Sequence, residues 1–133
     1  RIAAEAPANV ADAIELDVRM SPWPVGSYDA IFSANTLHYM GVDCVQAFFA
    51  GVGQALLPGG LLVVYGPFKY QGEYTSHSNG RFDIILKQAD PLRGIRDFEW
   101  ICELAVTDKL ELEVDHVMPA NNQLLVWRKA TML

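Results

Sequence analysis

Cysteine, histidine and basic residues are scarce in this sequence, and each shortage narrows the classes of function. The 133 residues include two cysteines, Cys44 and Cys102, and three histidines that match no metal-ligand spacing. We therefore expect no metal site and a reducing, cytoplasmic compartment. Ten Lys and Arg against sixteen Asp and Glu give a net charge of −6, the wrong sign for a general nucleic-acid binder.

Long hydrophobic runs are also missing. The longest uncharged and mostly apolar stretch, residues 44–57, is shorter than the roughly 20 residues that span a bilayer, so we expect no membrane partner. The chain opens on Arg1 without the charged and apolar regions of a signal peptide, and we expect a chain entered partway. With 51% hydrophobic and 20% charged residues, the composition predicts one packed domain or a large part of one.

Strand and helix patterns alternate in the first half of the chain. Alternating apolar residues over 13–18 predict a strand, and the apolar run over 28–34 predicts a strand buried on both faces. Apolar residues then recur every three or four positions over 43–56, which predicts a helix that ends at Pro58-Gly59-Gly60. A buried strand over 61–65 follows. This alternation is typical of an α/β fold with a mostly parallel sheet.

The second half begins with an irregular stretch over 66–77 and continues with two helices. Asp97 is the expected N-cap of the second helix. Alternating residues over 110–116, a turn at 119–122 and an apolar run over 124–127 predict a terminal antiparallel hairpin. The expected buried faces of the two helices comprise Phe82, Ile85, Leu86 and Ala89 in the first and Phe98, Ile101, Leu104 and Ala105 in the second.

Three ordered blocks, at 16–18, 28–39 and 57–64, resemble the later part of the Rossmann-like class I S-adenosylmethionine-dependent methyltransferases. The runs at 33–39, 65–68, 94–99 and 118–122 are still more similar to the uncharacterised methyltransferase-like domain of unknown function 938 family. The resemblance covers nearly the whole chain. It implies a methyltransferase that uses S-adenosylmethionine to methylate a small molecule.

The family's first two strands, with their glycine-rich loop and ribose-binding acidic residue, have no counterpart in this sequence and would precede Arg1. We therefore expect an amino-terminally truncated domain, residues 1–133, that is itself inactive. The Gly51-Val52-Gly53 run lies inside a helical pattern with no strand before it, so we expect it to serve helix packing. Without the absent strands, residues 13–18 would lack a partner. Either they lie detached or re-paired, or the chain depends on the absent segment or another chain to fold.

The resemblance also assigns roles to residues at strand ends. Asp17, followed by Val18, would bind the cofactor's adenine, and Asn35 and Leu37 would flank its methionine part or ribose. Alternatively, Asp17 caps a loop and Asn35 makes an ordinary turn. His38 has the pKa range of a catalytic base, although a structural histidine is the alternative.

Aromatic and polar residues after the third strand are candidates for a substrate pocket, or for a lid that packs on the core. Arg96 would recognise an anionic substrate, whereas helix capping and a surface ion pair explain it as well. We expect Asp17, Asn35 and the 65–68 turn to meet at one sheet edge. The candidate substrate-binding residues are Tyr65, Pro67, Phe68, Tyr70, Asn79 and Arg96.

The predicted reaction is displacement at the cofactor's methyl group by an oxygen, nitrogen or carbon nucleophile, promoted by holding the reactants close and in line. A non-catalytic binding or scaffold protein with the same fold is the alternative, and a Rossmann-type dehydrogenase is a third possibility. The sequence leaves the oligomeric state open.

Overall fold

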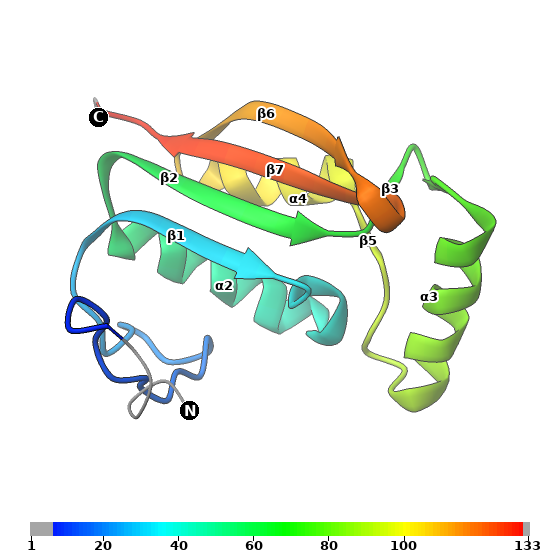
Figure 1. Cartoon of the computed structure of the whole chain (residues 1–133), viewed down its shortest axis with the longest axis horizontal. Helices are drawn as coiled ribbons and strands as arrows, with labels where there is room; N and C mark the ends of the chain where they lie inside the picture. Colours follow the sequence, from blue (N-terminus) through cyan, green and yellow to red (C-terminus); the bar gives the residue numbers. More distant parts are fainter. Residues whose placement is uncertain (1–6, 132–133) are drawn as a thin grey trace.

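The structure, a computed structural model, describes residues 7–131. Its main sheet has four strands in the order β1-β2-β7-β6, in which β1 and β2 are parallel and the other neighbours are antiparallel (Figure 1). The strands span Tyr28–Ala34 (β1), Leu56–Gly66 (β2), Leu110–Met118 (β6) and Asn122–Lys129 (β7). The fold is mixed α/β, and both the parallel pair and the terminal hairpin are confirmed.

Two helices, α2 and α4, lie on one face of this sheet, and α3 stands beyond its end beside a small second sheet (Figure 1). The second sheet has the order β4-β3-β5 and occupies part of the stretch that the sequence left irregular. The bounds are Val42–Ala55 (α2), His77–Ala89 (α3) and Phe98–Thr107 (α4), with Phe68–Tyr70 (β3), Glu73–Tyr74 (β4) and Arg96–Asp97 (β5) in the small sheet.

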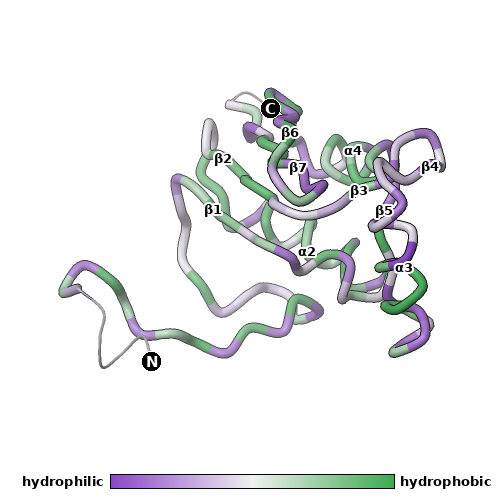
Figure 2. The backbone as a smooth tube through the Cα atoms, turned by 45° about the vertical axis from the view of Figure 1, so that its right-hand side comes forward, coloured by the Kyte–Doolittle hydropathy of each residue, from purple (hydrophilic) through white to green (hydrophobic). Residues whose placement is uncertain are grey.

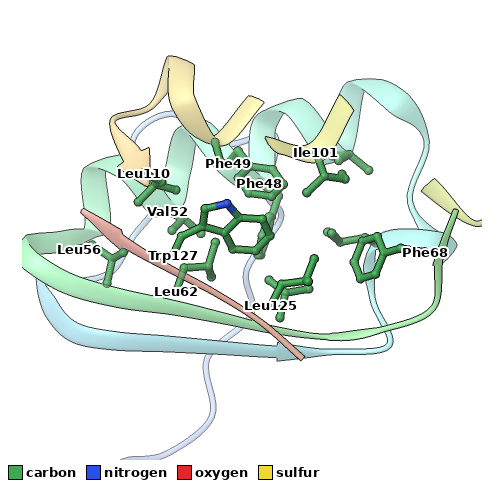
Figure 3. Packing of buried hydrophobic residues seen from close by; sticks show 14 residues of the cluster. Phe48, Phe49, Val52, Leu56, Leu62, Phe68, Ile101, Leu110, Leu125 and Trp127 are labelled. Atoms are coloured by element: carbon green, nitrogen blue, oxygen red, sulfur yellow. The ribbon is translucent and has the colours of Figure 1, made fainter. Parts of the chain in front are cut away.

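The hydrophobic core lies between the main sheet and the two helices (Figure 3). Phe48, Phe49, Val52 and Leu56 are all buried there, as the recurrence of apolar residues over 43–56 predicts. The ring of Phe49 meets the indole of Trp127 edge-on, with the ring centres 5.8 Å apart. This contact joins α2 to β7, so helix and hairpin share one core.

The opposite face of the sheet is bare within residues 7–131. Phe32, Val63, Val126 and Val114 form one row across the four strands, because the register pairs Phe32 with Val63, Val63 with Val126 and Val126 with Val114. Phe32 is 66% exposed. The prediction that β1 is buried on both faces is therefore wrong, since the described part of the chain covers only one face.

The prediction of a strand over 13–18 is also wrong. This segment is irregular and belongs to an arm outside the sheet, in which Ile14 and Leu16 are exposed (Figure 2). A strand is stable only when its backbone groups form hydrogen bonds to a neighbouring strand. Within residues 7–131, no strand lies beside residues 13–18 to provide these bonds. The expectation that the segment would lie detached is confirmed. The arm touches the core through Val18 and Trp23.

The two helices after β4 differ from the sequence-based predictions in two details. Helix α3 forms as predicted, and the expected face is confirmed at buried Leu86 and half-buried Phe82. It is wrong at Ile85, which is 61% exposed, and at Ala89, which is also exposed. The buried residues of α3 are Asn79, Asp83 and Leu86. Asp97 occupies the N-cap position of α4, yet its side chain makes no capping hydrogen bond.

Candidate functional site at the carboxyl edge of the sheet

Asn35 directly follows β1 and lies beside the end of β2. Its backbone N–H donates to the carbonyl of Tyr65 over 2.9 Å, and its φ of 57° is in the left-handed region that asparagine tolerates better than most residues. A Cβ added to Gly66 would lie 4.0 Å from Asn35 Oδ1 and 3.8 Å from His38 Nδ1. The predicted meeting of Asn35 with the 65–68 turn is confirmed.

His38 lies on a 3-10 turn, Leu37–Tyr39, that follows Asn35. The side chain is buried, with its ring centre 5.5 Å from Phe82 and 4.7 Å from Tyr39. Burial and, secondarily, the positive charge of Arg96 lower the pKa of His38 to about 4. At neutral pH the imidazole is therefore uncharged, with one ring nitrogen able to accept a proton or a hydrogen bond.

Of the other candidate cofactor residues, Asp17 and Val18 lie on the arm, and Leu37 shares the turn with His38. Asp17 is exposed on the arm and pairs with Arg19, whose Nη2 lies 2.8 Å from Asp17 Oδ2. The hydrogen bonds from Arg19 lower the pKa of Asp17 to about 2. The carbonyl of Val18 accepts a hydrogen bond from Trp23 Nε1 over 3.0 Å, and Leu37 is buried in the core. The expectation that Asp17 follows a strand of the sheet is wrong, because its segment forms no strand.

The four aromatic-turn candidates differ in their environments. Pro67 is buried, and Phe68 belongs to the core cluster. Tyr70 stacks on Phe98 with ring centres 4.8 Å apart and donates its hydroxyl hydrogen to Asp115. Tyr65 is half-buried at the end of β2, where its hydroxyl receives a hydrogen bond from the side chain of Asn122. Whether these residues bind a substrate stays a prediction.

Asn79 fastens α3 to the turn between β6 and β7. Its side-chain Nδ2 donates to Thr75 Oγ1 and to the backbone carbonyl of Asn121, each over 3.1 Å. In return, Asn121 Nδ2 donates to Ser78 Oγ over 3.1 Å. Sequence reasoning missed this clamp, for which the turn-forming asparagines at 121 and 122 were the only signal. The amide hydrogens of Asn79 are therefore already engaged within the protein.

Asp83 is a buried carboxylate that the sequence analysis missed. It accepts hydrogen bonds from the hydroxyl of Tyr74, the backbone N–H of Ile95 and the ammonium of Lys87. Burial alone would raise the pKa of Asp83, but these three donors together lower it. The available signal was an acidic residue between Phe82 and Leu86 on an otherwise apolar helix face.

Three hollows in the described part of the chain are lined by neither Asn35 nor His38. A hollow of about 660 Å³ lies against the start of α3, lined by Gly72 to His77 and Gly80. Two smaller hollows, of about 340 and 490 Å³, are each lined by Val42, Lys87 and Arg96 among other residues.

Within residues 7–131, no cluster of His, Cys, Asp and Glu side chains is placed to hold a metal ion. None of the helices in that range combines the length and apolarity needed to cross a membrane.

Comparison with known proteins gives a family and a fold. A sequence model of the family described as "Protein of unknown function (DUF938)" matches residues 1–129.

Three solved structures are similar to the chain. An O-methyltransferase family protein from Burkholderia thailandensis has a TM-score of 0.70 at 15% identity, with 81% of this chain and 32% of that chain covered. Human N-acetylserotonin methyltransferase in complex with SAM has a TM-score of 0.68 at 15% identity, with 81% of this chain and 31% of that chain covered. An O-methyltransferase family 2 protein from Planctomyces limnophilus in complex with apigenin has a TM-score of 0.71 at 17% identity, with 80% of this chain and 32% of that chain covered. The chain thus spans about a third of the length of these relatives.

Proposed function

The chain belongs to the family described as protein of unknown function DUF938, and from that premise we propose that it is part of an S-adenosylmethionine-dependent methyltransferase acting on a small molecule. The observation that carries the proposal is the carboxyl edge of the parallel pair, where Asn35 and His38 meet around Gly66. Open α/β sheets bind ligands at this edge. Neighbours with the same fold are methyltransferases, and human N-acetylserotonin methyltransferase is described in complex with SAM.

The residues present fit this cofactor only in part. Asn35 Oδ1 lies at the strand ends beside a glycine, where a ligand can approach the backbone. Asp17 is paired with Arg19 on the arm, and the side chain of Leu37 is in the core. The cofactor would supply an electrophilic methyl group, but residues 7–131 offer it too few contacts for a reaction step to be derived through it.

His38 is the candidate proton acceptor. Its uncharged imidazole can take a proton from an oxygen or nitrogen nucleophile. A base whose pKa is about 4 has little driving force for that transfer, so the larger contribution would be to hold the nucleophile in position.

We further propose that the functional unit contains the strands and the glycine-rich loop that the sequence resemblance places before this chain. A strand paired with the open edge of β1 would satisfy its free backbone groups. Helices over the row of Phe32, Val63 and Val126 would cover apolar surface that α2 and α4 leave bare. The length comparison supports this view, because this chain covers only about a third of each matched neighbour.

The experiment is an NMR titration of the chain with S-adenosylmethionine at millimolar concentration. We expect the backbone amide signals of Asn35, His38 and Gly66 to shift, because these residues form the proposed binding edge. NAD added in the same way should produce no such shifts. Shifts with NAD alone would favour the dehydrogenase reading, and no shift with either ligand would contradict the proposal.

A pair of variants localises the binding. Asn35→Gly keeps the left-handed backbone and removes the amide, so we expect weaker shifts. Lys109→Gly makes the same kind of change at a φ of 64°, at the opposite end of the sheet, and should bind like the parent. Equal binding by both variants would remove Asn35 from the site.

A further inference from the structure

The turn that carries His38 is held from one direction by the segment at 94–96. The backbone N–H of Gly94 donates to the carbonyl of His38 over 3.0 Å. Arg96 Nε donates to the carbonyl of Leu37 over 3.4 Å, and Arg96 Nη2 donates to the carbonyl of Met40. Three carbonyls within four residues of the turn thus have their partners in a segment more than 50 residues away in the sequence.

The holding segment is itself anchored. Asp83 Oδ1 accepts the backbone N–H of Ile95 over 2.9 Å, and Asp83 Oδ2 accepts the ammonium of Lys87 over 3.0 Å. A Cβ on Gly94 would lie 3.0 Å from Lys87 Cε and 3.2 Å from Asp83 Oδ1, closer than most side chains allow. Only glycine fits there without displacing the carboxylate or the lysine. Helix α3 therefore fixes the segment that fixes the turn.

The guanidinium of Arg96 donates hydrogen bonds to backbone carbonyls of the protein itself. Besides Leu37 and Met40, its Nη2 donates to the carbonyl of Leu92 over 2.7 Å. A planar fork that reaches several carbonyls is a geometry that arginine provides and lysine does not. The acceptors are backbone groups on both sides of His38, which points to a role in holding the turn.

We propose that Arg96 is a positioning residue, which holds the turn of His38 at the carboxyl edge of the sheet. The importance of His38 for a reaction rests on the proposed function, but the grip of Arg96 on the turn does not. A cation near the imidazole also disfavours its protonated form, as the lowered pKa of His38 indicates. Arg96 thus acts on both the place and the charge of the histidine.

The test is the NMR titration of the His38 ring in ligand-free protein. In Arg96→Met, which loses the fork and the charge, we expect the pKa of His38 to rise by about one unit and the amide signals of residues 37–40 to move. In Arg96→Lys, which keeps the charge, the amide signals should move while the pKa stays nearer that of the parent. Arg81→Met removes an exposed positive charge from α3 and should change neither signal.

A purely structural role in folding would lower stability without this pattern. If the pKa of His38 and the turn signals are unchanged in folded Arg96→Met, the proposal is overturned. Should that variant fail to fold, the parent decides, because the Nε and Nη hydrogens of Arg96 should exchange slowly with water. Exchange as fast as that of an exposed arginine would overturn the proposal.

Two further outcomes separate this inference from others. Inorganic phosphate probes whether Arg96 instead binds an anionic substrate: we expect no change in its Nε signal, and a saturable shift would overturn the positioning role. The measurements need no cofactor. A chain that shows the expected His38 response but no shift with S-adenosylmethionine would retain the positioning role and lose the proposed function.

Discussion

Single residues in α2 show that its Gly51-Val52-Gly53 run serves packing, as the sequence analysis expected. A Cβ on Gly51 would lie 2.0 Å from Trp23 Cε2, so the bare backbone at this position is what lets the indole lie against the helix. The indole then donates to the carbonyl of Val18 over 3.0 Å. The glycine therefore holds the arm before β1 against α2.

Gly51→Ala should displace Trp23. Alanine favours the helix by roughly 1 kcal/mol, while the lost indole contacts oppose this gain, so we expect a change in unfolding free energy within about 1 kcal/mol. The sensitive measurement is hydrogen exchange at Trp23 Nε1, which should become faster as the bond to Val18 breaks. Gly26→Ala is the control, because no atom lies within 4 Å of its added Cβ. Unchanged exchange in Gly51→Ala would contradict the packing assignment.

His38 should make stability depend on pH. Its pKa of about 4 in the folded protein lies below the ordinary value of 6.5, so the unfolded chain binds more protons between these values. The contribution is fully present above pH 6.5 and is lost as the pH falls toward 4, by at most about 3 kcal/mol. Urea unfolding at pH 7 and pH 5 measures the loss. His38→Gln should show a smaller loss, and an equal loss in both proteins would show that other groups cause it.

At the scale of elements, the contact between α2 and the hairpin can be tested through Phe49, which meets Trp127 of β7. Phe49→Ala should lower the unfolding free energy by about 3 to 5 kcal/mol, because a fully buried ring against Trp127 leaves a cavity. Chemical denaturation measures the change. Phe32→Ala makes the same deletion at an exposed site and should cost less than about 1 kcal/mol. Equal losses in the two variants would mean that the helix face is assigned wrongly.

Elements with local periodicity could be predicted from the sequence, and elements that depend on a distant partner could not. The pattern over 43–56 contains its own evidence for a helix, and the alternation over 110–116 does the same for the hairpin. Residues 13–18 alternate just as a strand does, but an unpaired strand has no stability of its own. The face of α3 was predicted only in part, because buried Asn79 and Asp83 are held by hydrogen bonds to other segments.

The same distinction applies to the candidate site. Asn35 could be placed at the sheet edge because parallel strands bring their carboxyl ends together. The position of Arg96 could not, since the carbonyl of Leu37 that it holds lies 59 residues earlier in the chain. A lone arginine in a sequence indicates a charge but not whether that charge faces a ligand or the backbone.

At the scale of the whole molecule, residues 7–131 form a sheet that helices cover on one face only. The two edge strands of this sheet are β1 and β6, and Phe32 of β1 exposes its ring on the uncovered face. The edge of β1 exposes unpaired backbone donors and acceptors, and the bare face exposes apolar area. Both features lie next to Asn35, so whatever covers them in the functional unit would also border the candidate site.

The affinity for S-adenosylmethionine tests this view of the molecule. Of the four candidate cofactor residues, Asn35 alone has its side chain at the strand ends, whereas Asp17 and Val18 are on the arm and Leu37 is in the core. We therefore expect the 133-residue chain to bind no more tightly than about millimolar, or roughly −4 kcal/mol, which calorimetry can measure. Sedimentation under the same conditions establishes whether the chain is monomeric. Micromolar binding by a monomer would show that these residues already complete the cofactor site, and the proposed contribution of further strands would have to be abandoned.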